Sequence, residues 1–162
     1  MWWIVGVVAV VVVIATYVTW TASRVDRLHA RAAAAQTALD AHLARRAAAA
    51  SDLADTLRSP DLREMAAAAL QAYPDERELA ENDLTRALRA VPRQSRGELA
   101  FDEVVSLSRR LALSRQVHND LVRDALAVRR RRLVRLLRLA RRHPEPRYFD
   151  VDEPTLGQPT RV

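Results

Sequence analysis

The chain has 162 residues, of which 28% are charged and 5% aromatic, with three Gly and no Cys. The lack of Cys excludes disulfides, thiolate metal sites and thiol nucleophiles, and the scarcity of aromatic residues and Gly favours long helices over sheets. The net charge of +6 is uneven, because residues 129–142 hold eight Arg and no acid, which leaves 18 Arg against 20 acidic residues elsewhere.

Residues 2–23 carry no charged side chain and predict a transmembrane helix over residues 1–23. The stretch from Trp2 to Trp20 would span about 28 Å as a helix, close to the hydrocarbon thickness of about 30 Å. Aromatic residues at both ends, Trp2 and Trp3 at one and Tyr17 and Trp20 at the other, are expected at the membrane–water interface. A cleaved signal peptide would begin with basic residues and end in small ones, which this stretch does not.

The basic residues that flank the span predict its orientation. Arg24, Arg27 and Arg31 follow it at once, and no basic residue precedes it. The positive-inside rule then puts the N-terminus outside and the body in the cytoplasm, with the protein in the cell membrane as a single-pass protein.

The body, residues 24–142, has apolar residues at helical spacing. The first stripe predicts a helix that continues from the membrane span to Ser59-Pro60, where Ser is a good N-cap and Pro fits the first helical position. A second helical pattern runs from Pro60 to Tyr73, is interrupted at Pro74 and continues to Pro92. Residues Pro92 to Gly97 predict a loop. The first stripe consists of Leu28, Ala32, Ala35, Leu39, Leu43, Ala50, Leu53 and Leu57.

The last helix, expected over residues 98–142, carries the cleanest heptad pattern, which predicts a coiled-coil-like seam. Residues 143–162 have no apolar period and contain Pro146, Pro154 and Pro159, so we expect a disordered tail. The seam consists of Phe101, Val104, Leu107, Leu111, Ser114, His118, Leu121, Ala125 and Val128.

The helix lengths suggest an all-α antiparallel bundle. If Pro74 only kinks a helix, the three rods measure about 52, 48 and 67 Å, and the Arg-rich end, residues 129–142, lies away from the membrane. We favour this three-helix arrangement. If the chain reverses at Pro74, the bundle has four helices and the Arg-rich end returns to the membrane.

Three stretches, in this order, resemble motifs of the LemA family of bacterial membrane proteins. Two features depart from the family pattern. His118 stands where the family has Tyr, and the Arg-rich residues 129–142 stand where the family has an aromatic-rich segment. The resemblance implies a membrane-anchored helical scaffold without a known chemical activity. The stretches are AAQTALDAHLARR (Ala34 to Arg46), AENDLTRAL (Ala80 to Leu88) and SRQVHNDLV (Ser114 to Val122).

No enzyme site or cofactor is expected. Residues 77–82, RELAEN, resemble the end of the Nudix hydrolase signature, but Ala69 stands where its first Glu should be. Mg²⁺-assisted hydrolysis needs clustered carboxylates, and this stretch keeps only Glu78 and Glu81. We therefore interpret it as a solvated first helical turn, with both Glu paired to Arg77 or Arg86. Ser residues have no neighbouring base, and the His residues have no metal-ligand spacing.

Polar residues within the last seam, Ser114, His118 and the adjacent Asn119, are expected to set helix register through a hydrogen bond rather than to bind a ligand.

The Arg-rich end is the main functional candidate. On a continuous helix, Arg131, Arg135, Arg138 and Arg142 would form one basic stripe opposite an apolar face. Such a stripe could bind anionic lipid or an acidic protein, or be a solvated helix end covered by the acidic tail. Nucleic acid is a weaker candidate because aromatic stacking residues are scarce. The sequence makes no prediction of oligomeric state.

Overall fold

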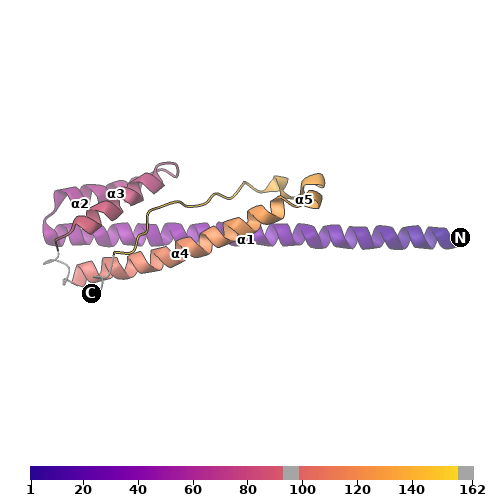
Figure 1. Ribbon diagram of the computed structural model, residues 1–162, viewed down its shortest axis with the longest axis horizontal. Coiled ribbons are helices and arrows are strands. Elements are labelled where there is room, and N and C mark those ends of the chain that lie inside the picture. The colour runs from indigo at the N-terminus through magenta and orange to yellow at the C-terminus, as the bar shows by residue number, and fades with distance from the viewer. Residues whose placement is uncertain (93–98, 157–162) are drawn as a thin grey trace, which may run out of the picture. The chain divides into compact units, whose positions relative to one another are not determined.

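A computed structural model describes residues 1–92 and 99–156 (Figure 1). These ranges contain helices and no strand, which confirms the all-α class. Apart from Pro92, the expected loop Pro92 to Gly97 lies outside the described residues. The helices are α1 (Trp2–Leu57), α2 (Pro60–Gln71), α3 (Arg77–Ala90), α4 (Leu99–Arg129) and α5 (Arg132–Leu136), followed by a 3-10 helix, Leu139–Arg142.

Helix α1 contains both the apolar span and the first part of the body without a break. Within the described residues, it is the one helix that is long and apolar enough to cross a membrane. Its few hydroxyls in and next to the apolar stretch bond to the helix itself: Thr16, Thr19 and Thr21 donate to the carbonyls four residues earlier at 2.8, 2.9 and 2.8 Å. Because lipid offers no hydrogen-bond partner, this pairing lets polar side chains lie in an apolar span.

The predicted break after α1 is confirmed in its details. Arg58 adopts a left-handed conformation with φ 52°, which ends the helix. Ser59 is the N-cap of α2, where its hydroxyl accepts a hydrogen bond from the Leu62 amide, and Pro60 opens the helix. Both residues therefore do what their local preferences predict.

Residues 60–91 form two helices and not one rod kinked at Pro74, so the three-rod interpretation is wrong. Ala72, at the C-cap of α2, is extended with ψ 131°, and Glu76 N donates to Tyr73 O in a turn around Pro74. Helices α2 and α3 then pack against each other (Figure 1). The physical reason is that Pro disfavours a helical conformation in the residue before it, which here is Tyr73.

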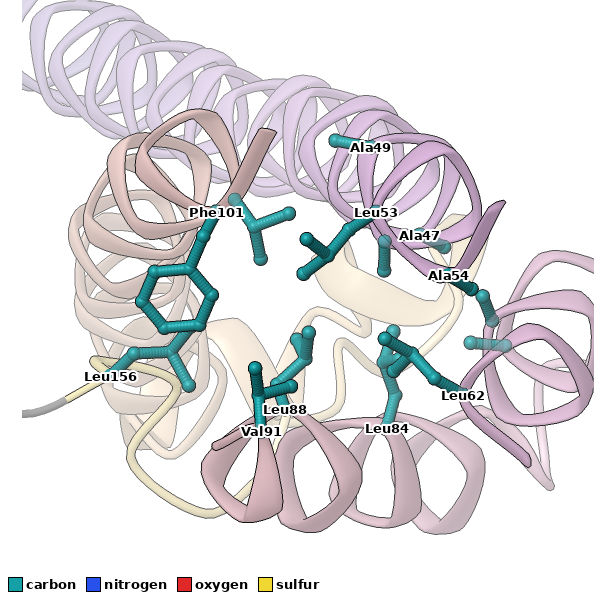
Figure 2. Packing of buried hydrophobic residues seen from close by; sticks show 14 residues of the cluster. Ala47, Ala49, Leu53, Ala54, Leu62, Leu84, Leu88, Val91, Phe101 and Leu156 are labelled. Carbon is teal, nitrogen blue, oxygen red and sulfur yellow. The ribbon is translucent and has the colours of Figure 1, made fainter. Parts of the chain in front are cut away.

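The chain divides into two compact units, the first made of residues 1–34 and 120–148 and the second of residues 35–119 and 149–162. In the second unit, helices α1 to α4 all contribute side chains to one apolar core. Figure 2 shows Leu53, Leu62 and Leu84 directed into this core from three helices, with the Phe101 ring of α4 at its side. Every predicted stripe residue of α1 and every seam residue of α4 is buried or half-buried.

Residues 143–156 have no helix or strand, but residues 149–156 are packed, which differs from the expected disordered tail. Phe149 and Val151 are buried against Leu39, Leu43 and Leu111, and Leu156 lies beside the Phe101 ring (Figure 2). The reason is the alternation of apolar and acidic residues in Phe149-Asp150-Val151-Asp152, a period of two that suits an extended chain with one buried side.

The Arg-rich end is folded differently from the expected continuous helix. Helix α4 ends at Arg129, and Arg138 has a left-handed backbone with φ 53° between α5 and the 3-10 helix. In the first unit, Val128, Val134 and Ala140 pack on Val25 of α1. The segment therefore lies beside the residues that follow the apolar span, and the expectation that it lies far from them is wrong.

The buried core predicts a position-dependent cost of truncation along α3. Leu84→Ala should lower the free energy of unfolding by about 2–5 kcal/mol, because Leu84 is fully buried. The matched change Leu79→Ala, at a side chain that is 64% exposed on the same helix, should change it by about 0.5 kcal/mol or less. Urea unfolding in detergent, followed by circular dichroism at 222 nm, measures both, and equal effects would contradict the described burial.

Candidate functional site

A buried polar network joins three helices in the second unit. The Arg46 guanidinium on α1 donates from Nη1 to Glu81 Oε2 at 2.8 Å, from Nη2 to Thr85 Oγ1 at 2.7 Å and from Nε to Ser108 Oγ at 3.1 Å. The Thr85 hydroxyl in turn donates a hydrogen bond to the backbone carbonyl oxygen of Glu81 at 2.8 Å. All four residues have a relative exposure of 0%. The network therefore ties α1 to α3 and α4 inside the core.

The electrostatics of this network are dominated by loss of solvent. Burial lowers the pKa of Arg46 and raises the pKa of Glu81, and in each case the attraction between the two groups opposes the shift without cancelling it. One carboxylate oxygen, Glu81 Oε1, has no hydrogen-bond partner among the described residues. An acceptor that is buried without a donor destabilises the ionised carboxylate, so the geometry agrees with the direction of the Glu81 shift.

The sequence did not predict this network, and it assigned the wrong environment to Glu81. Glu81 pairs with Arg46 in the core and is not solvated, Arg77 pairs with Asp40 at 2.9 Å, and Arg86 pairs with Asp83. A signal was present: Arg46 lies three residues after Leu43 and four before Ala50, which puts a charge on the apolar stripe of α1.

The three polar seam residues have different surroundings. His118 is buried with 2% exposure, and Ser114 is half-buried. Asn119 binds the backbone of Phe149 in both directions: its Nδ2 donates to Phe149 O at 3.1 Å, and Phe149 N donates to its Oδ1 at 3.0 Å. The amide of Asn119 thus holds the C-terminal segment. The α4 hydroxyl in the buried network belongs to Ser108, which lies next to the seam residue Leu107, and not to the seam residue Ser114.

A second polar cluster, in the first unit, holds the Arg-rich segment in place. Arg129 Nη1 reaches Ala140 O and His143 O at 3.1 Å each and lies 3.3 Å from His29 Nε2. His29 Nδ1 lies 2.9 Å from Val25 O. One ring nitrogen of His29 thus faces a backbone carbonyl oxygen and the other faces the Arg129 guanidinium. The His29 and His143 rings stack at 4.7 Å, and His143 Nε2 is 2.8 Å from Asp26 Oδ1.

The predicted basic residues do not form one helical stripe, because the chain turns at Arg131 and again at Arg138. Arg131, Arg135, Arg138 and Arg142 are nevertheless all exposed. A pocket in the first unit brings cations together with two aromatic rings of α1; it is lined by Tyr17, Trp20, Thr21, Arg24, Val128, Arg131, Arg132, Leu133 and Val134.

The predicted interfacial aromatic residues are all exposed on α1. Trp2 and Trp3 are 92% and 72% exposed, and Tyr17 and Trp20 are 50% and 52% exposed. The ring centroids of Tyr17 and Trp20 lie 6.3 Å apart. The Arg24 guanidinium carbon lies 5.8 Å from the centre of the Trp20 ring. Trp20 thus takes part in a cation–π contact with Arg24 at the end of the apolar span.

Each of the three stretches singled out in the sequence contributes polar contacts to the second unit. Arg46 of the first stretch binds Glu81 and Thr85 of the second, and Asn119 of the third holds Phe149.

Residues 1–92 and 99–156 contain no group of three or more His, Asp or Glu side chains that could hold a metal ion. No family model, curated protein or solved structure matches the chain.

Breaking the buried ion pair from one side should cost more than removing it whole. Arg46→Met leaves Glu81 buried without its partner and should lower the free energy of unfolding by about 3–5 kcal/mol. The double change Arg46→Met with Glu81→Leu leaves neither charge buried, and it should recover most of that loss. Urea unfolding in detergent tests this, and a double variant less stable than the single one would contradict it.

The raised pKa of Glu81 gives a signed pH dependence. Because the folded state holds the Glu81 proton more tightly than the unfolded state, the contribution of this group to stability is fully present below its ordinary pKa of 4.5. It is lost as the pH rises through the higher folded pKa. The stability of the wild type relative to Glu81→Gln, which does not titrate, should therefore fall from pH 4.5 upward. Melting temperatures of both proteins across this range measure it; a difference that stays constant or grows would refute the assignment.

Proposed function

We propose that this protein is a membrane-anchored antiparallel helical scaffold, without catalytic chemistry of its own, whose Arg-rich segment binds anionic lipid headgroups. The Arg-rich segment is residues 129–142. The single observation that carries the proposal is the packing of Val128, Val134 and Ala140 on Val25, directly after the apolar span. This packing brings exposed Arg side chains beside Tyr17 and Trp20, the aromatic residues that we expect at headgroup level.

The charge of this region suits a lipid surface. Seven of the eight Arg in residues 129–142 are exposed, and Arg24, Arg27 and Arg31 on α1 are exposed as well. The eighth, Arg129, is used to hold the segment. An Arg near an anionic membrane surface contributes about 1 kcal/mol, so such a cluster favours anionic over neutral headgroups. An acidic protein could use the same cations, but Tyr17 and Trp20 in the same pocket favour the membrane.

The proposal includes a place in the cell. The basic residues after the span favour a cytoplasmic body and an external N-terminus, with the chain in the cell membrane. The resemblance to LemA supports the same kind of molecule, an anchored helical scaffold. The buried Arg46 network supports it as well, because it stiffens the body and has no open space in which a substrate could meet its charges.

Lipid quenching of Trp20 tests the lipid site. In the full chain with Trp2→Phe and Trp3→Phe, Trp20 is the sole Trp and lies in the pocket with Arg131 and Arg132. In vesicles with equal mole fractions, doxyl-labelled phosphatidylglycerol should quench it more strongly than doxyl-labelled phosphatidylcholine. Arg131→Gln, Arg132→Gln and Arg135→Gln together should remove about half or more of that excess, since each Arg contributes about 1 kcal/mol.

The matched control removes three exposed Arg from the second unit, Arg45, Arg109 and Arg110, also as Gln. It changes net charge by the same amount and should leave the excess quenching unchanged. Equal quenching by the two lipids in the Trp20 protein would refute the lipid site. An equal loss in both triple variants would show that net charge, and not this segment, attracts the lipid.

A further inference from the structure

The second unit holds residues 149–156 as an extended segment between α3 and α4. We call the side chains that bind this segment the tail site: Glu78, Asn82 and Arg89 on α3, and Arg115 and Asn119 on α4. Glu78 accepts from Asp150 N at 3.0 Å, and Asn82 accepts from Asp152 N at 2.8 Å. Arg115 donates to Val151 O, and Arg89 donates to Glu153 O. With the two bonds of Asn119, these contacts go to the main chain of the segment.

The spacing of the tail site matches an extended chain. On α3, Glu78 binds Asp150, and Asn82, four residues later, binds Asp152, two residues later in the segment. On α4, which runs in the opposite direction, Asn119 binds Phe149, and Arg115, four residues earlier, binds Val151. Four helical residues rise about 6 Å and two extended residues about 6.6 Å, so both helices keep step with the segment.

Side chains of the segment add selectivity to these main-chain contacts. Phe149 and Val151 fill an apolar surface made by Leu39, Leu43 and Leu111. The Glu153 carboxylate accepts from Arg115 at 3.3 Å. Asp150 and Asp152, between the buried residues, are exposed. The occupant is thus recognised as an extended chain with two bulky apolar side chains, two positions apart, and acidic residues beside them.

We propose that the tail site is a peptide-binding site, which residues 149–156 occupy in cis as an exchangeable ligand. Its partner is an extended acidic segment of another protein with the same alternation. Main-chain contacts carry little sequence information, so such a segment can replace the chain's own. Without an occupant, Leu39 and Leu111 would be exposed to water, so release of residues 149–156 requires a replacement of the same chemistry.

Peptide binding to the full chain tests this proposal. The probe is a fluorescent peptide with the sequence EPRYFDVDEPTL of residues 145–156, added to the protein in detergent. The cis segment competes at an effective concentration in the millimolar range. Phe149→Ser with Val151→Ser in the protein weakens that competitor, so this variant should bind the peptide at least tenfold more tightly than the wild type, as measured by anisotropy.

Two controls make the result specific. Adding Asn119→Ala to the double variant removes two main-chain hydrogen bonds and should weaken peptide binding at least fivefold. A peptide with Ser in place of its Phe and Val should not bind. Absence of peptide binding by the double variant with an unchanged helical signal overturns the proposal, and so does binding that Asn119→Ala leaves unchanged.

A locked variant decides the matter if the double variant loses its helical signal. Because the chain has no Cys, Asn82→Cys with Asp152→Cys provides the only two thiols, which a short bismaleimide can join. Joining them should abolish the residual peptide binding of this otherwise wild-type protein and give a monomeric product. Unchanged peptide binding after joining overturns the proposal. A dimeric product also overturns it, since the natural occupant would then be a second copy.

Discussion

The burial of one guanidinium constrains the whole second unit. Arg46 lies on the apolar stripe of α1, and its charge can be tolerated in the core only if acceptors surround it. Glu81, Thr85 and Ser108 supply them from α3 and α4. A shift of α3 along α1 by one turn, about 5.4 Å, would separate the guanidinium from these acceptors. Apolar packing alone tolerates such slips, so the network fixes which turn of one helix faces which turn of another.

Local sequence signals predicted most of the helices, because the residues that begin and end them act through their own backbone preferences. Ser59 and Pro60 are the clearest case, and the heptad pattern of α4 predicted its buried face equally well. Two features could not be predicted in this way. The reversal at Pro74 depends on whether α2 and α3 can pack on each other, and the burial of Glu81 depends on Arg46, which is 35 residues away. Pro74 interrupts the helix locally, but the packing of α2 on α3 and the pairing of Glu81 with Arg46 are contacts between helices, which local preferences do not show.

The candidate sites show the same division. The aromatic residues of α1 and the exposed Arg residues were recognisable from composition and position. Their proximity was not, because it follows from the end of α4 at Arg129 and the left-handed turn at Arg138. The tail site was missed because Phe149, Val151 and Leu156 lie among Pro residues. The Pro content of the segment is typical of disorder, and the alternation of Phe149 and Val151 with acidic residues is too short to stand out. Asn119 was noticed as polar, but its partner could not be inferred from its own helix.

The packing of Phe149 on Leu39 has a consequence for biogenesis. Ribosomes make proteins from the N-terminus onward, so Leu39 and Leu43 emerge long before the aromatic ring that covers them. Arg46 is likewise synthesised before Glu81, its partner in the buried ion pair. During that interval Leu39, Leu43 and Arg46 of α1 lack these partners. A chain that ends before Phe149 would therefore leave the surface of Leu39 and Leu43 uncovered and prone to aggregation.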